Sequence, residues 1–270
     1  MRRIVHISDL HFGRANPALL KPLLANIVEL QPNVVAVSGD LTQRATEEQF
    51  DAARGFLQQI HFPKIVVPGN HDISLWNLYR RFLRPLERYR RYISAEVEPS
   101  YADDRLFVLG INTARSLTWK EGRISLDQIA RIRERFSILH PHILKILVVH
   151  HPFIPPEGTT AGSSLGRAQL ALEVMEHCGA DLILAGHLHH SYSRQTASFY
   201  RTAEHSILVV QSGTTLSERT RKELNSFNVI DVKADVASIT VHTWAPAHAA
   251  FVPQRPILYE KRGEWRQVRE

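Results

Sequence analysis

The sequence predicts an α/β fold with a core of buried parallel strands, and two observations support this prediction. Short apolar, β-branched runs alternate with longer segments of helical periodicity from residue 4 to residue 185, which is the pattern of repeated strand–helix–strand units with right-handed crossovers. The chain has 270 residues, of which 44% are hydrophobic. It is therefore long enough to bury a large core as one domain.

Cap residues mark the starts of the first two predicted helices. Asn16 stands at a favoured N-cap position and Pro17 at the first helical position. Thr46 and Gln49 have the spacing of a capping box. The elements predicted in this part are strand Ile4–Ser8, helix Pro17–Leu30, strand Val34–Ser38, helix Thr46–Gln59 and strand Ile65–Pro68.

The segment Ser74–Ser94 is both amphipathic and strongly basic. Its apolar residues recur at three- and four-residue spacing, which predicts a helix that breaks near Pro85. Against one acid, Glu87, it carries six arginines: Arg80, Arg81, Arg84, Arg88, Arg90 and Arg91. Two interpretations stay open here, a solvated helical face or a positive rim that attracts phosphate-bearing substrates.

The strand–helix alternation continues to residue 185 and then stops. The elements predicted up to that point are strand Arg105–Asn112, helix Ser125–Phe136, strand Ile143–Val149, helix Ser164–His177 and strand Asp181–Ala185. Beyond Ser206 no helical periodicity intervenes, so we expect one antiparallel ladder with a hairpin at Lys233–Val236. Its strands are Ile207–Gln211, Phe227–Val232 and Ser238–Trp244. We expect one domain over residues 1–245, extended by a strand or hairpin in the tail, residues 246–270.

Composition limits the class of protein. Cys178 is the only cysteine, so no intramolecular disulfide can form and a reducing, cytoplasmic compartment is expected. No apolar run approaches the roughly 20 residues needed to cross a bilayer, which argues against a membrane protein. The formal charge of +6 favours anionic partners.

Five short polar clusters each follow a predicted strand. They contain carboxylates, an amide and imidazoles but no thiolate, a set that suits borderline divalent ions held in pairs. Because open α/β sheets build their sites at the carboxyl ends of strands, we expect the clusters to meet. The clusters are Asp9-Leu10-His11, Gly39-Asp40, Gly69-Asn70-His71-Asp72, His150-His151-Pro152 and Gly186-His187-Leu188-His189.

Spacing suggests how some of these residues act together. Asp9 and His11 are two residues apart, so both should project to the same side of an extended strand end. The same holds for His187 and His189. Asp40 is a candidate bridging carboxylate, because each of its two oxygens can hold one metal. Each cluster alone can be explained by a structural role, as a cap, a turn or a buried histidine. All five such explanations would have to hold at once, so one dinuclear metal centre explains the clusters better.

The clusters resemble the pattern of the calcineurin-like metallophosphoesterase superfamily, D-x-H, G-D, G-N-H-[DE], H and G-H-x-H, in order, loop length and strand context. The resemblance covers the chain from Ile4 to about Asp231. It implies a four-layer α/β/β/α sandwich with two mixed β-sheets and a dinuclear site for manganese, iron or zinc ions. By this resemblance, the first ion would be held by Asp9, His11, Asp40 and His189, and the second by Asp40, Asn70, His150 and His187.

The same resemblance suggests residues that act around the ions. His71 would donate a proton to the leaving oxygen. Arg44 lies in a stretch similar to the G-D-x-x-D-R-G of the phosphatase branch and would contact phosphate. Gln43 stands where that branch has the acid that partners its catalytic histidine, which argues against a protein phosphatase. His151 and Asn112, next to or just past strand ends, are further candidate substrate-binding residues.

The motifs Ser-Asp-Leu-His-Phe, Ser-Gly-Asp-Leu-Thr and Pro-Gly-Asn-His-Asp are most similar to those of the bacterial class III cyclic nucleotide phosphodiesterase group. We therefore expect hydrolysis of a small-molecule phosphodiester, such as a cyclic nucleotide, by a hydroxide that bridges two metal ions. A nuclease of the same superfamily, acting on DNA or RNA, is an alternative that the pI near 9.6 encourages. It is not favoured, because no extra domain to hold a duplex is evident. A non-catalytic scaffold would usually have lost ligands, whereas here all positions are filled. Assembly into a homo-oligomer stays open.

Overall fold

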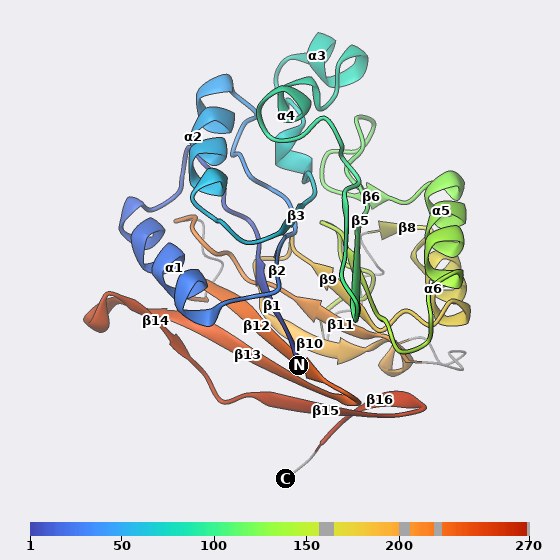
Figure 1. Cartoon of the computed structure of the whole chain (residues 1–270). Coiled ribbons are helices and arrows are strands. Elements are labelled where there is room, and N and C mark those ends of the chain that lie inside the picture. Colours follow the sequence, from blue (N-terminus) through green and yellow to red (C-terminus); the bar gives the residue numbers. More distant parts are fainter. Residues whose placement is uncertain (157–164, 200–205, 219–222, 269–270) are drawn as a thin grey trace.

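The computed structural model describes residues 1–156, 165–199, 206–218 and 223–268. Two mixed β-sheets lie face to face (Figure 1). Helices α1 (Pro17–Leu30) and α2 (Glu47–Gln58) lie on the outer face of one sheet, and α5 (Leu126–Ser137) and α6 (Ala168–His177) on the outer face of the other. The predicted four-layer α/β/β/α sandwich is therefore confirmed.

The first sheet joins parallel and antiparallel strands. Strands β1 (Arg2–Ile7), β2 (Val34–Val37) and β3 (Lys64–Val66) run parallel and are connected by α1 and α2. Strand β12 (Ser226–Lys233) pairs antiparallel with β1. The strand order is β16 (Glu264–Gln267), β15 (Ile257–Arg262), β13 (Val236–Ala245), β12 (Ser226–Lys233), β1 (Arg2–Ile7), β2 (Val34–Val37) and β3 (Lys64–Val66), with β14 (Ala250–Pro253) paired to β13.

The second sheet has a parallel centre and two antiparallel edges. Its strand order is β10 (Tyr192–Gln195), β11 (Leu208–Gln211), β9 (Leu182–Ala185), β7 (Leu144–Val148), β5 (Leu106–Gly110) and β4 (Ser100–Ala102). Helices α5 (Leu126–Ser137) and α6 (Ala168–His177) cover it, and a short parallel pair, β6 (Gly122–Arg123) and β8 (Leu165–Gly166), lies apart from both sheets. The 3₁₀ turns are η1 (Asn70–Asp72), η2 (Thr196–Ser198) and η3 (Pro246–His248).

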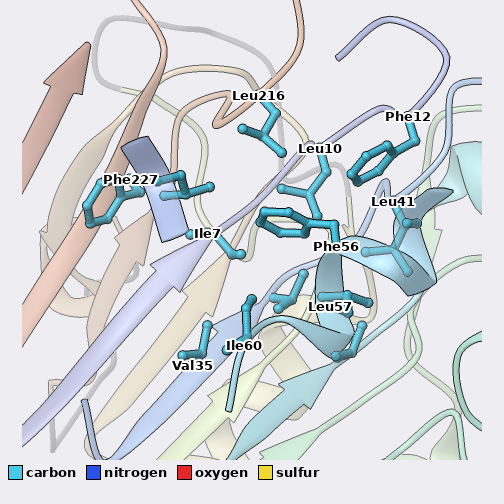
Figure 2. Packing of buried hydrophobic residues seen from close by; sticks show 14 of the residues in the cluster. Ile7, Leu10, Phe12, Val35, Leu41, Phe56, Leu57, Ile60, Leu216 and Phe227 are labelled. Atoms are coloured by element: carbon cyan, nitrogen blue, oxygen red, sulfur yellow. The ribbon is translucent and has the colours of Figure 1, made fainter. Parts of the chain in front are cut away.

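Three apolar layers hold the sheets and helices together. In β2, Val35 and Val37 face the helical side, while Val34 and Ala36 face the other sheet, as the two-residue period of a strand requires. Both faces are buried, which explains why the strand sequence is apolar at every position. On the helical side, Phe56 of α2 packs among side chains of the sheet and its loops (Figure 2).

Side chains cap the starts of three helices, two of them at the predicted cap residues Asn16 and Thr46. The side chain of Asn16 accepts a hydrogen bond from the Ala18 amide at the start of α1. The Ser125 and Gln128 capping box is complete at α5. At α2 only half of the box forms, because Gln49 accepts a hydrogen bond from the backbone amide of Arg44 instead.

The amphipathic segment breaks into two short helices, α3 (Leu78–Leu83) and α4 (Glu87–Tyr92). The break falls at Arg84–Leu86, around the predicted Pro85. Both helices lie at the top of the molecule (Figure 1), and α4 is tied to the first sheet by Tyr89, which is buried and donates a hydrogen bond to the Val66 carbonyl of β3.

The antiparallel ladder expected beyond residue 206 is wrong in one strand. Strand β11 pairs parallel with β9 in the second sheet, whereas β12 and β13 form the expected antiparallel pair in the first. An edge strand that the sequence did not reveal, β10, pairs antiparallel with β11. Because β10 reverses the chain direction without a helix, β11 can run parallel to β9. The lack of helical periodicity before β11 therefore did not require an antiparallel neighbour.

Two further segments refine the sequence prediction. Helix α6 begins at Ala168 because Leu165 and Gly166 pair with β6; Ser164, the expected start, lies outside the described residues. After residue 245 the chain adds β14 and the β15–β16 hairpin to the first sheet. No helix in the described part of the chain is long and apolar enough to cross a membrane.

We predict that His242 makes the fold sensitive to mild acid. Its ring stacks on Phe227 with 4.9 Å between centroids, and burial, together with the charge of Arg3, lowers the pKa of His242 to about 4. Protonation therefore favours the unfolded chain, and the stabilisation present above pH 6.5 is lost as the pH falls from 6.5 to 4. Denaturant titrations at pH 6.5 and pH 4 measure the free energy of unfolding. The decrease between the two pH values should be smaller for His242→Gln than for wild type. Equal losses would contradict the prediction, and His61→Gln, at an exposed position, is the control.

Candidate metal centre

The carboxyl ends of five parallel strands deliver the predicted ligands to one place. Asp9 follows β1, Asp40 follows β2, Asn70 follows β3, His150 follows β7 and His187 follows β9. The parallel strands of the two sheets thus end on the same side of the sandwich, as expected for a site in an α/β fold.

The backbone at these strand ends is not extended. Asp9, His11, Asp40, His187 and His189 all have positive φ angles, between 46° and 79°. We expected an extended backbone to place the two residues of each pair on the same side, and this explanation is wrong. The side chains of both pairs nevertheless reach the same centre. Left-handed conformations of non-glycine residues cost energy and gather at functional sites.

The first group of ligand atoms lies around Asp9. Its Oδ1 atom is 3.6 Å from His11 Nε2 and 3.7 Å from His189 Nε2. His11 Nε2 is in turn 3.7 Å from Asp40 Oδ2, and the rings of His11 and His189 are stacked. These separations exceed a hydrogen bond and leave room for an ion between the atoms.

The second group lies around Asn70. Its Oδ1 atom is 3.1 Å from both His150 Nε2 and His187 Nδ1. His150 Nε2 is also 3.3 Å from Asp40 Oδ1. The two carboxylate oxygens of Asp40 thus face different groups, Oδ2 the first and Oδ1 the second.

Unpartnered buried atoms test whether this geometry fits metal ions. Among the described residues, Asp9 Oδ1 and His11 Nε2 are buried without any hydrogen-bond partner. Leaving such atoms unpaired is costly in a folded protein, whereas both are natural donors to a cation. The ligand atoms of Asp9, His11 and His189 lie within 4.8 Å of one another, and so do those of Asp9, Asp40 and His150. The side chains present therefore fit a pair of ions.

Neighbouring polar groups orient the ligands. Ser8 Oγ donates to Asp9 Oδ2 at 2.6 Å. The Nδ1 atom of His150 donates to the Ser38 carbonyl at 2.8 Å, which leaves Nε2 facing the centre. His189 Nδ1 is 2.5 Å from Thr214 Oγ1. Such outer partners fix the ring and the tautomer of a metal-binding histidine.

Sequence reasoning missed Ser8 and Thr214. Ser8 precedes Asp9 in the Ser-Asp-Leu-His-Phe motif, but a serine at a strand end carries no signal of its own. Thr214 follows β11, and it could not be placed because β11 was assigned to the wrong sheet. Gly186 allows the chain to pass close to Ser8, because a Cβ atom at this position would lie 1.9 Å from Ser8 Oγ.

The buried charges of the centre are strongly coupled. Burial would raise the pKa of Asp9 and Asp40, but the histidines around them hold it below its usual range. Asp40, working against burial, raises the pKa of His150 to about 9. Burial and the charge of His150 lower the pKa of His187 to about 4. Two ionised carboxylates are thus buried together, in surroundings that require positive charge.

His71 lies beside the same cluster of side chains. Its ring meets that of His11 edge to face, 4.9 Å between centroids, and its backbone amide donates to Asp40 Oδ1 at 2.9 Å. Its Nδ1 atom donates to the backbone carbonyl of Gln43 at 2.9 Å. That carbonyl orients the ring in the absence of the acid that the phosphatase branch has at this position.

The three candidate substrate-binding residues occupy different surroundings. His151 is buried beside His150 and His187, and its Nδ1 atom is 2.8 Å from Thr113 Oγ1. Asn112 uses its side-chain oxygen to accept from the Ala114 amide in a turn. Arg44 is exposed on the loop after β2. Of the three, the structure brings only His151 into contact with the ligand side chains.

Proteins with similar sequences and folds include phosphoesterases. A probable cyclic nucleotide phosphodiesterase of Vesicomyosocius okutanii is 23% identical over 238 residues, covering 84% of this chain and 94% of the relative. The glycerophosphodiester phosphodiesterase GpdQ of Enterobacter lignolyticus is 31% identical over 94 residues, 31% of this chain and 33% of the relative. A purple acid phosphatase from yellow lupin seeds has the same fold, with a TM-score of 0.70 and 15% identity over 97% of this chain. This chain spans about half of the lupin protein, 54% of its length.

The family comparison covers the part of the chain that builds the centre. The model of the calcineurin-like phosphoesterase family matches residues 2–191. That range includes every cluster from Asp9 to His189 and the five parallel strands that precede them, β1, β2, β3, β7 and β9. This chain is therefore an enzyme of the calcineurin-like phosphoesterase family, whose members hydrolyse phosphoesters at a metal centre.

Proposed function

We propose that the chain is a small-molecule phosphodiesterase that uses two metal ions, manganese, iron or zinc. Asp9, His11, Asp40 and His189 would hold the first ion, and Asp40, Asn70, His150 and His187 the second. The single observation that carries this proposal is the division of the Asp40 carboxylate, whose two oxygens face separate groups of ligand atoms.

The residues of the centre prepare it for hydrolysis. When bound, the ion pair would supply an activated water at neutral pH and neutralise phosphate oxygens. Asp9 and Asp40 provide the negative charge that would hold two cations close together. The His71 ring, fixed by the Gln43 carbonyl at Nδ1, can carry a second proton at Nε2 and donate it to the leaving oxygen. Sequestration of these groups from water strengthens each electrostatic interaction.

The diester preference rests on relatives. The two curated proteins described above are named as phosphodiesterases, one for cyclic nucleotides and one for glycerophosphodiesters. A small diester of this kind would be bound by the ions and, we propose, by His151, Asn112 and Arg44. A reducing, cytoplasmic location would suit the single cysteine.

Asp40→Asn tests the shared carboxylate. An amide has one oxygen acceptor in place of two and no charge, so we expect loss of bound metal together with loss of hydrolysis. Metal analysis of the purified variant, beside an assay of a chromogenic diester, measures both. If metal content and turnover survive this substitution, the bridging assignment is wrong.

His71→Ala tests the proton donor separately from the metals. The variant should retain both ions, because its side chain is not among the proposed ligands. Positioned acids contribute about 10²–10⁴-fold to rate, so kcat should fall most for esters with poor leaving groups and least for a nitrophenyl ester. A uniform decrease across leaving groups would contradict this role. His61→Ala, at an exposed site, is the matched control.

A substrate panel tests the reaction class. We expect hydrolysis of cyclic and linear diesters after addition of Mn²⁺, little hydrolysis after chelation, and slower hydrolysis of the corresponding monoesters. Rapid cleavage of monoesters alone would replace the proposal with a phosphomonoesterase, and efficient cleavage of DNA would favour a nuclease.

A further inference from the structure

A short segment, residues 118–122, contacts two side chains at the metal centre, those of Asn70 and His151; we call it the strap. The Trp119 carbonyl accepts a hydrogen bond from Asn70 Nδ2 at 3.3 Å. At the other end of the strap, Gly122 lies against His151, so closely that a Cβ atom there would be 2.4 Å from His151 Cγ. Neither contact involves a proposed reacting atom, yet both touch residues that line the centre.

One buried arginine fastens the strap to α3. Arg81 is 1% exposed. Its guanidinium donates to the carbonyls of Ser74 and Thr118 and lies over the Trp119 ring, 4.3 Å from the ring centroid. The Thr118 carbonyl and the Trp119 ring both belong to the strap, so a single cation holds it from two directions.

The charge of Arg81 is costly where it lies. Among the described residues no carboxylate lies within 4 Å of it, and its Nε atom has no hydrogen-bond partner. By contrast, its neighbours Arg80 and Arg84 are partly exposed and pair with Glu87. Burial of an unpaired charge opposes folding, so fold stability alone does not account for an arginine at position 81.

The strap carbonyl determines which end of the Asn70 amide faces the centre. While Nδ2 donates to the Trp119 carbonyl, Oδ1 must point to His150 and His187. An amide that lost this acceptor could turn over and present its NH₂ group to the ion. The NH₂ group is a hydrogen-bond donor with a partial positive charge, so it would repel the cation. Packing alone would not prevent the turn, because the two orientations of the amide have nearly the same shape.

We propose that Arg81 is a positioning residue for the second metal ion: by holding the strap, it keeps the Asn70 carbonyl oxygen directed at that ion. The inference rests on the proposed function, because it requires the ion pair. It links the basic segment, residues 74–94, to the chemistry of the centre through main-chain contacts instead of through direct contact with substrate.

Metal binding tests this proposal without reference to activity. Apo protein is titrated with Mn²⁺, and the affinities of the two ions are fitted separately. Loss of an outer partner typically weakens metal binding 10–100-fold, so Arg81→Met should weaken one ion by about this factor and leave the other unchanged. Arg80→Met, one residue away on the surface of α3, is the control and should leave both affinities unchanged. Arg81→Lys, which keeps the charge and one donor nitrogen, should retain part of the affinity that Arg81→Met loses.

A double-mutant cycle separates positioning from general stability. In Asn70→Asp both side-chain atoms are oxygen acceptors, so orientation by the strap is no longer required. Arg81→Met should therefore have little effect on metal affinity in the Asn70→Asp background. If Arg81→Met fails to fold, Trp119→Ala removes the stacking partner at a half-exposed position and should weaken the same ion.

Each other outcome overturns the proposal in a recognisable way. Equal weakening of both ions, or the same loss in the Asn70→Asp background, would show a structural role. Unchanged affinities with a raised KM would make Arg81 a substrate contact. If wild-type protein binds two ions and hydrolyses diesters while Arg81→Met does the same, only this inference fails. If wild-type protein binds no ions, the proposed function fails as well.

Discussion

The structure depends on two ionised carboxylates that are buried among histidines. Asp9 and Asp40 have almost no exposure, and the histidines beside them keep the pKa of both below its usual range. Burial of a charge is costly unless opposite charge or hydrogen bonds compensate it. The rest of the centre can be understood as compensation: His150 is held with a pKa of about 9, and backbone and hydroxyl donors occupy the outer lone pairs. A pair of cations would serve the same electrostatic need more completely than protons do.

The two-sheet architecture explains how such a centre can exist. Both sheets direct the ends of their parallel strands to one side of the sandwich, and three apolar layers hold those strands in place. The strained turns after the strands, with positive φ at Asp9 and Asp40 among others, are stabilised by this packing. Strain at the centre is therefore supported by burial elsewhere in the molecule.

The basic segment acquires a different meaning in three dimensions. In sequence its arginines form one charged run, but only Arg81 is buried, where it contacts the strap. The others are at least partly exposed, and Arg80 and Arg84 share Glu87. The run therefore contains both solvated arginines and one buried arginine that contacts the segment next to Asn70. Composition cannot distinguish them, because it does not say which side of a short helix is covered.

The sequence by itself determined the α/β alternation, the helix starts at Asn16 and Ser125, and the clusters at the strand ends, because caps and strand periods are local properties. Family resemblance supplied the layers and the proposed ligand sets. Only the tertiary structure decided the contacts made by residues far apart in the chain. It placed β11 beside β9 and so brought Thr214 to His189; it gave His71 a backbone partner where an acid is missing; and it set the Trp119 carbonyl against Asn70. These pairings depend on strand order and loop path, which local preference does not encode.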